Sequence, residues 1–356
     1  MTEGPAPVEP DYTTLFGLVE RYSPSGEERE AVDWLVGRLQ TLGYDRAWRD
    51  EAGNAVGVRG EGARQIVLLG HIDTVPGKIF PRQDGDRFFG RGAVDAKGPL
   101  AAFVDAAGRV TPASGWQIIV IGAVDEERDS TGARYVRDRY SPQFAIIGEP
   151  SRWDRVTLGY KGSAWAEVVC RTKAAHSAGQ AQNASEQAVG IWEAVRTWAH
   201  GYNQGHERAF DQLLPALRGL ASGSDGFEEW ARLQVGVRLP PDMRPQDWYD
   251  RLQEIAHQAQ VSPLGYPIPA YQAEKNTPLV RAFLAAIRAQ GGKPGFVLKT
   301  GTADLNIVAP VWNCPAVAYG PGDSSLDHTP EEHLLLSEYR LAVVTLAAVL
   351  AQLCAG

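Results

Sequence analysis

Continuous apolar runs that end in acidic or histidine residues recur along the first half of the chain. Three of them, at residues 66–70, 118–124 and 144–147, predict central strands covered on both faces. Between the first two runs, residues 97–110 have the apolar spacing of a helix. The alternation of strand, loop and helix is typical of an α/β sheet, in which ligands gather beyond the carboxyl ends of the strands.

Weaker patterns flank this central region. Ser25-Gly26-Glu27-Glu28 is a capping-box pattern that opens a predicted amphipathic helix at about 27–42, and residues 48–58 alternate as a hairpin does. Towards the end of the chain we predict a helix at 278–290 and strands at 295–299 and 316–319. The last helix is predicted to begin at Thr329, with Glu332 closing a second capping box and His328 at its rigid edge.

The pattern changes after about residue 159. A half-buried strand at 165–171, a helix at 184–199, a second strand at 233–238 and a second helix at 245–258 follow one another. Clusters of Gly, Ser and Pro at 201–226 and 262–269 bracket these elements. We therefore predict an inserted α+β domain at 159–266, within a catalytic domain made of residues 1–158 and 267–356.

Composition narrows the classes of partner. A chain of 356 residues with 44% apolar and 22% charged residues is an ordinary globular protein. Its net charge of -8 argues against nucleic acid, since nucleic-acid binders carry a basic face. The first ten residues lack the pattern of a signal peptide, and the apolar run at 341–350 is too short to span a bilayer. We therefore expect a cytoplasmic protein without a membrane partner, with Cys170, Cys314 and Cys354 as reduced core residues.

The polar residues at the strand ends form a set of metal-ligand type. They supply two imidazoles and several carboxylates, the donors suited to a pair of zinc-like divalent ions. Each has an ordinary alternative role, such as a turn, a helix cap or an acceptor for backbone amides. Their common position at one rim of the sheet favours the metal interpretation. They are His71, Asp73, Asp95, Asp125, Glu126, Glu127, Glu149 and His328.

Two of these motifs carry a physical reason for their spacing. His71 and Asp73 lie on the same side of an extended chain, so that the aspartate can accept the second ring N–H of the imidazole and fix its tautomer. Neighbouring Glu126 and Glu127 can divide the work, one binding a cation while the other takes a proton from water. On a solvated loop, the same acidic run would still be tolerated as a turn.

Six motifs in chain order resemble the acetylornithine deacetylase, succinyl-diaminopimelate desuccinylase and carboxypeptidase metallohydrolase family. The resemblance implies that His71, Asp95 and Glu149 bind one metal and that Asp95, Glu127 and His328 bind the other, with Asp95 bridging. It also implies that Glu126 is the general base and that Asp73 supports His71. The motifs are Gly70-His71-Ile72-Asp73-Thr74-Val75-Pro76, the stretch from Gly90 to Gly98, Asp125-Glu126-Glu127, Gly148-Glu149-Pro150-Ser151, Ala175-His176-Ser177-Ala178 and Thr300-Gly301-Thr302-Ala303-Asp304.

The same resemblance implies a fold and a quaternary structure. The catalytic domain is expected to be zinc-aminopeptidase-like, with a central mixed, mostly parallel sheet, and residues 159–266 to form a ferredoxin-like lid that makes a homodimer. His176 is expected to reach the neighbouring subunit's active site and stabilise an oxyanion. Arg238 matches the lid arginine that binds a substrate carboxylate, and Gly301 and Thr302 are expected to line the pocket.

The predicted reaction is hydrolysis of an amide. Two divalent ions, zinc or alternatively cobalt, about 3.5 to 4 Å apart would share a water whose proton Glu126 accepts. The motifs around Asp95 and Lys161 are most similar to the branch that frees lysine or ornithine from the C-terminal glutamate of a small acidic amino-group carrier protein. The alternatives are a small-molecule deacylase, such as acetylornithine deacetylase, and a metal-binding relative without catalytic activity.

Overall fold

The computed structural model describes residues 11–174 and 182–355. Within these residues the chain divides into two compact units. The first unit comprises the chain up to Leu158, Ala273–Val297 and the chain from Ile307 onward. The second comprises Gly159–Gln272 together with the short segment Leu298–Asn306.

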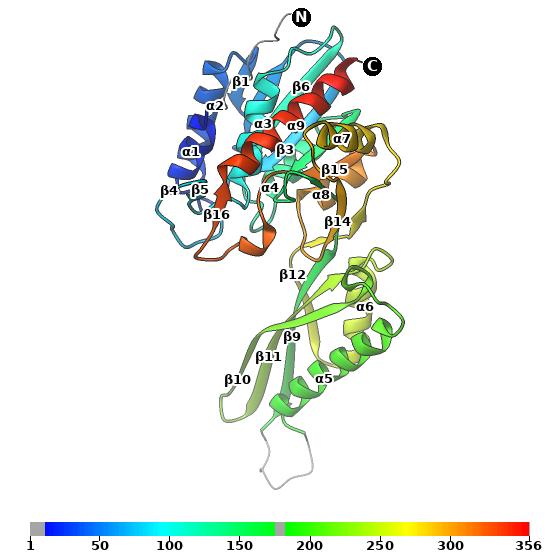
Figure 1. Ribbon diagram of the computed structural model, residues 1–356. Helices are drawn as coiled ribbons and strands as arrows, with labels where there is room; N and C mark the ends of the chain where they lie inside the picture. The colour runs from blue at the N-terminus through cyan, green and yellow to red at the C-terminus, as the bar shows by residue number, and fades with distance from the viewer. Residues whose placement is uncertain (1–10, 175–181, 356) are drawn as a thin grey trace, which may run out of the picture. The chain divides into compact units, whose positions relative to one another are not determined.

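The first unit is built on a twisted mixed sheet (Figure 1). At its centre, four strands run parallel in the order β6-β3-β7-β15, with antiparallel strands on both sides. The central strands are β3 (Arg64–His71), β6 (Trp116–Ala123), β7 (Phe144–Gly148) and β15 (Ala316–Tyr319). The flanking strands are β1 (Arg46–Arg49), β2 (Ala55–Arg59), β8 (Arg155–Tyr160) and β14 (Gly295–Lys299). The short strand β13 (Tyr271–Gln272), which pairs with the end of β8, falls within the second unit.

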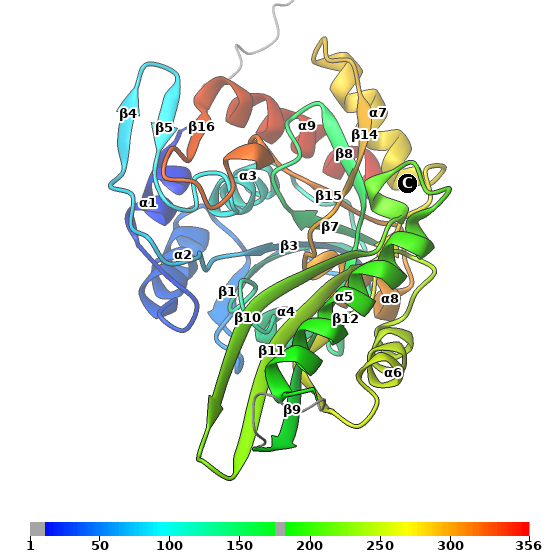
Figure 2. The ribbon, with the colours of Figure 1, turned by 90° about the horizontal axis from the view of Figure 1, so that it is seen from below.

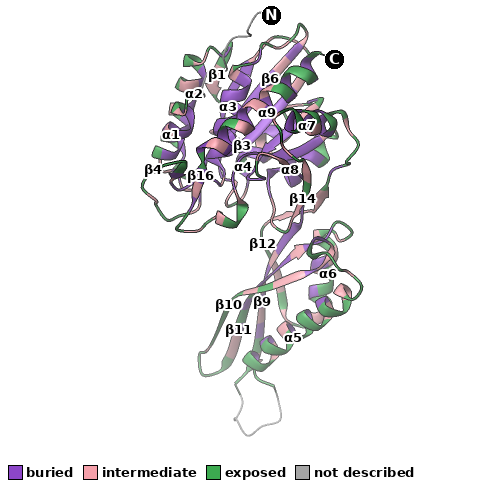
Figure 3. Cartoon of the chain, viewed as in Figure 1, coloured by how far each residue is buried: buried purple, intermediate pink, exposed green. Residues whose placement is uncertain are grey.

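Helices cover both faces of this sheet. Figures 1 and 2 show α3 (Lys97–Gly108) and α9 (Leu336–Ala355) on one face, and α4 (Thr131–Arg137) and α8 (Asp304–Trp312) on the other. Because helices cover both faces of the central strands, the apolar runs of these strands are continuous and buried (Figure 3). The remaining helices of the unit are α1 (Thr13–Glu20), α2 (Arg29–Thr41) and α7 (Pro278–Ala289).

The predicted central strands, the hairpin and the helix after Asp95 are confirmed. The predicted helix beginning at Thr329 is wrong. The chain there forms β16 (His333–Leu335), which pairs with β5 (Arg87–Phe89), and the helix begins only at Leu336. β5 also pairs with β4 (Arg82–Asp84), so pairing with a distant hairpin overrides the local capping pattern.

The second unit has the β-α-β-β-α-β order of a ferredoxin-like fold, as predicted. Its four-stranded antiparallel sheet has the order β10-β11-β9-β12. Both outer strands lie in the Gly, Ser and Pro clusters and were not among the predicted strands. The elements are β9 (Gly162–Lys173), α5 (Ala184–Asn203), the 3-10 turn η1 (Ala209–Asp211), β10 (Leu214–Ser224), β11 (Glu228–Leu239), α6 (Pro245–Ala256) and β12 (Gln260–Ile268).

Helix α9 is the one described helix that is long and apolar enough to cross a membrane, judged by length and composition. Of its apolar window, 56% is buried inside the protein. It packs against α3 and α7, as the core helix of a globular unit does.

Candidate metal centre

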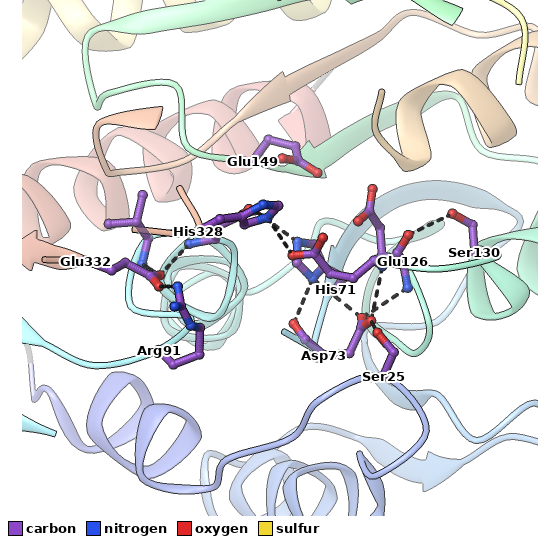
Figure 4. Close-up of polar contacts among 12 residues, drawn as sticks. Ser25, His71, Asp73, Arg91, Glu126, Ser130, Glu149, His328 and Glu332 are labelled. Atoms are coloured by element: carbon purple, nitrogen blue, oxygen red, sulfur yellow. Dashed lines mark hydrogen bonds and ion pairs between the residues drawn. The ribbon is translucent and has the colours of Figure 1, made fainter. Parts of the chain in front are cut away.

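The predicted ligands meet at one edge of the first unit's sheet. His71 is the last residue of β3, while Glu126 and Glu127 follow β6 and Glu149 follows β7. These strands are parallel neighbours, so their carboxyl ends bring the three segments together. Figure 4 shows the side chains of His71, Glu126 and His328 gathered there, with Glu149 facing them from the other side.

Asp95 lies between two imidazoles and uses a different oxygen for each. Its Oδ1 is 3.3 Å from Nε2 of His71, and its Oδ2 is 3.0 Å from Nε2 of His328. The Asp95 side chain is 13% exposed, and a cis peptide bond joins Asp95 to Ala96, directly before α3. A carboxylate with this placement can serve two ligand sets at once, which is the arrangement expected of a bridge.

Glu127 and His328 complete the cluster. Oε1 of Glu127 is 3.1 Å from Nε2 of His328. One ligand atom each from His71, Asp95 and Glu127 lies within 4.8 Å of the others. His328 has a φ of 62°, in the left-handed region that a residue with a Cβ adopts at a cost. The surrounding fold therefore holds His328 at the rim in a backbone conformation that a histidine rarely adopts.

His71 is fixed by the chain immediately after it. Its Nδ1 is 3.0 Å from the backbone carbonyl oxygen of Asp73 and 3.6 Å from the Asp73 carboxylate. Burial lowers the pKa of His71, but the interactions with Asp73 and Asp95 raise it well above its usual value. An Nδ1–H directed at the carbonyl leaves Nε2, in the neutral ring, as the metal-binding nitrogen.

The Asp73 carboxylate also binds the backbone of the loop that follows β6. It accepts hydrogen bonds from the backbone amides of Glu126 at 3.1 Å and Glu127 at 3.2 Å, and from the Ser25 hydroxyl at 2.7 Å (Figure 4). Asp73 is fully buried. It therefore positions the loop that carries both the predicted base and a predicted ligand.

Ser25 was missed as a functional residue because it looked like a helix cap. Helix α2 begins at Arg29 after Glu28, without a side-chain cap, so the predicted capping box does not form. The hydroxyl of Ser25 is 48 residues from its acceptor, Asp73, in the sequence. No local pattern reports such a partner, and the capping motif was the one signal at this position.

The residues of this rim fit a divalent metal pair. Imidazole nitrogens and carboxylate oxygens are the donors that zinc takes, and they converge here from four separate segments. His71, Asp95 and Glu149 would hold one ion, and Asp95, Glu127 and His328 the other. Glu149 is 7% exposed and faces the cluster across the rim in Figure 4.

The predicted substrate residues belong to the second unit. Arg238, at the end of β11, donates from a guanidinium nitrogen to Oγ1 of Thr302 at 3.0 Å. Gly301 precedes Thr302 in the segment 298–306 of the same unit. The structure thus brings Arg238 and the Gly301-Thr302 pair together. His176 lies outside the described residues, and its role stays a prediction.

A family of known proteins matches most of the chain. The model of peptidase family M20/M25/M40 matches residues 67–352. The chain belongs to this family. A LysW-lysine hydrolase from Deinococcus radiodurans is 43% identical over 343 residues, which cover 94% of each protein. A LysW-lysine/LysW-ornithine hydrolase from Saccharolobus islandicus is 29% identical over 332 residues, covering 93% of this chain and 92% of the relative.

Solved structures of the M20 family share the fold. An M20 metallo-carboxypeptidase from Sulfolobus solfataricus has a TM-score of 0.77 at 18% identity, covering 96% of this chain and 99% of the other. A dinuclear metal-binding M20 peptidase from Bacillus subtilis has a TM-score of 0.70 at 16% identity, covering 96% of both. The predicted fold class is therefore confirmed, and the protein is an amide-bond hydrolase of a metal-dependent family.

Proposed function

We propose that this M20 enzyme releases lysine, ornithine or both from an amino-group carrier protein. The scissile bond is the amide between the side chain of the carrier's C-terminal glutamate and the α-amino group of the amino acid. The observation that carries this choice is the 43% identity, over 94% of both chains, to a LysW-lysine hydrolase. The reaction belongs to lysine and arginine biosynthesis and takes place in the cytoplasm.

The rim residues divide the chemistry. Two divalent ions, zinc or cobalt, would polarise the substrate carbonyl and lower the pKa of the attacking water when bound. Glu126 accepts the proton from that water and passes it to the departing amine. Asp73 holds the Glu126 amide at 3.1 Å and so fixes the start of this acidic pair.

The second unit supplies recognition in this proposal. Arg238 binds a substrate carboxylate, and its hydrogen bond to Thr302 orients the guanidinium. A fixed guanidinium loses less side-chain freedom when it binds an anion than a mobile one does. The unit also forms the homodimer, and His176 of the neighbouring subunit donates to the oxyanion.

A direct substrate comparison tests the function. The metal-loaded full chain is assayed for released amino acid with carrier-linked lysine, carrier-linked ornithine, acetylornithine and succinyl-diaminopimelate. We expect the highest kcat/KM with a carrier-linked substrate. A peptide that ends in the same modified glutamate tests whether the enzyme binds the body of the carrier or only its terminus. KM for the peptide should exceed KM for the whole carrier only if the enzyme binds the carrier body.

The outcomes separate the competing functions. Preference for acetylornithine or succinyl-diaminopimelate over both carrier substrates would make the protein a small-molecule deacylase. Two bound metals without turnover of any of the four substrates would instead favour a non-catalytic relative. The intact set of Glu126, Glu127 and His328 argues against that last reading.

A further inference from the structure

Glu332 is a buried carboxylate that none of the roles above uses. Its side chain is fully buried, and its two oxygens have different partners. Oε1 accepts hydrogen bonds from the backbone amides of Val94 at 2.9 Å and Asp95 at 3.1 Å. Oε2 accepts from a guanidinium nitrogen of Arg91 at 2.7 Å (Figure 4). The carboxylate therefore holds the loop of Asp95 at the residue that carries the proposed bridging ligand.

Arg91 extends this contact to a third segment. It is 7% exposed, and its Nε donates to the carbonyl oxygen of Gly77 at 2.9 Å. Gly77 lies on the chain that continues from His71 and Asp73. On the other side, Glu332 lies four residues after His328. One ion pair thus ties together the segments that carry His71, Asp95 and His328.

Stability alone does not account for this arrangement. A buried ion pair gains little over well-packed apolar residues, because both charges must first be taken out of water. Here, however, one oxygen is shared between two successive amides, and the second of them belongs to Asp95 itself. The side chain of that same residue spans the two imidazoles at 3.3 and 3.0 Å. Precise placement of the Asp95 backbone is what this contact provides.

We propose that Glu332 is a positioning residue that fixes Asp95 between His71 and His328, and so prepares both metal positions together. Arg91 holds the Glu332 carboxylate in place for this task. The inference rests on the proposed metal ligands and does not depend on which acyl amino acid is the substrate. Its expected effect is on metal affinity, with loss of turnover as a consequence.

The experiment measures metal binding to the metal-free full chain carrying Glu332→Ala. Zinc titration by calorimetry gives the two affinities, and the visible absorption of bound cobalt reports the ligand geometry. Loss of an outer partner of a metal ligand typically weakens metal binding about 10- to 100-fold. We expect a loss in this range at both positions, together with an altered cobalt spectrum.

Asp105→Ala is the matched control. Asp105 is also a buried carboxylate, 7% exposed, that accepts hydrogen bonds from Thr14 and Tyr339. It lies near the far end of α3 from Asp95. Its loss should lower the melting temperature without changing zinc affinity or the cobalt spectrum. This separates a general loss of stability from a loss of positioning.

Glu332→Gln keeps the size of the side chain and therefore keeps the fold if the alanine variant does not. Its amide oxygen can still accept from Val94 and Asp95, but its NH₂ group faces Arg91, so we expect a smaller loss of affinity in the same direction. Wild-type zinc affinities and cobalt spectrum in both variants would overturn the proposal. If wild-type protein binds two metals but does not cleave carrier-linked substrates, the proposed function fails while the role of Glu332 stands.

Discussion

Asp95 and its two histidines determine one another's charge. Burial raises the pKa of Asp95, but hydrogen bonds with His328 and His71 bring it below its usual range. The hydrogen bond with Asp95, which has the largest effect, and the hydrogen bond with Glu127 raise the pKa of His328 to about 10. Without metal, the cluster therefore keeps protons on its imidazoles at neutral pH. A metal ion must displace these protons before it can bind the ring nitrogens.

The first prediction at the residue scale is proton release on metal binding. The usual pKa of His328 is 6.5, and the folded value is about 10. The stabilisation that the protonated His328 ring gives the folded protein is therefore fully present below pH 6.5, and it is lost as the pH rises towards 10. Since protons compete with metal, apparent metal affinity should rise with pH across this window. Calorimetric zinc titrations at one pH, in buffers with different ionisation enthalpies, should show net proton release.

A pair of histidine variants sharpens this test. His328→Gln should release fewer protons than the wild type, because its side chain does not titrate. His333→Gln is the control, since His333 packs against Phe89 with ring centroids 4.9 Å apart and contacts none of the proposed ligands in the described chain. Binding heats that do not change with the buffer would contradict the charge states assigned here.

The second prediction concerns the general base. Glu126→Gln keeps the shape of the side chain and leaves the backbone contact with Asp73 intact, but it removes the proton acceptor. General-base catalysis typically contributes 10²- to 10⁴-fold, so we expect a fall of about this size in kcat. Metal content, measured by elemental analysis, should stay at the wild-type level. A variant with near wild-type kcat would remove Glu126 from the role.

At the scale of elements, the strands that carry the ligands could be predicted because burial on both faces leaves a continuous apolar run. β3, β6 and β7 show this pattern, and the polar residues that follow their carboxyl ends indicated where the candidate site lies. The outer strands β10 and β12 were missed because an edge strand tolerates Gly and Pro. Pro263 and Pro267 lie within β12, and Gly219 lies in β10 where the register shifts. Composition cannot distinguish such edges from loops.

The predicted capping boxes failed for a different physical reason. Ser25 and Glu332 each stood in a sequence that favours a helix start, yet both direct their side chains to the metal rim. Local capping stabilises a helix by about 1 kcal/mol, which a buried tertiary network exceeds. Contacts between residues 241 positions apart, as between Arg91 and Glu332, leave no trace in a single sequence. The meeting of the strand-end residues at one rim could be predicted, as could the place of Asp73 beside His71, whereas the contacts of Ser25 and Glu332 could not.

At the scale of the whole molecule, the residues with proposed roles are divided between the two units. The first unit holds all the proposed metal ligands and Glu126, while the second holds Arg238 and Thr302. The proposed function therefore draws on residues of both units. The second unit also has an outer strand, β10, that is suited to self-association.

The last prediction is that the protein is a homodimer that pairs through β10. This strand is an outer strand of its sheet and carries Leu220, which is 57% exposed, and Phe227, in the turn between β10 and β11, is 84% exposed. An exposed strand edge with apolar side chains is a template for pairing with a second copy about a two-fold axis. Light scattering should give the mass of two 38.7 kDa chains. Leu220→Lys should shift the mass towards one chain, whereas Val311→Lys, at a residue of α8 that is 52% exposed, should not. A monomeric wild type, or a Leu220→Lys variant that stays dimeric, would rule out this edge as the interface.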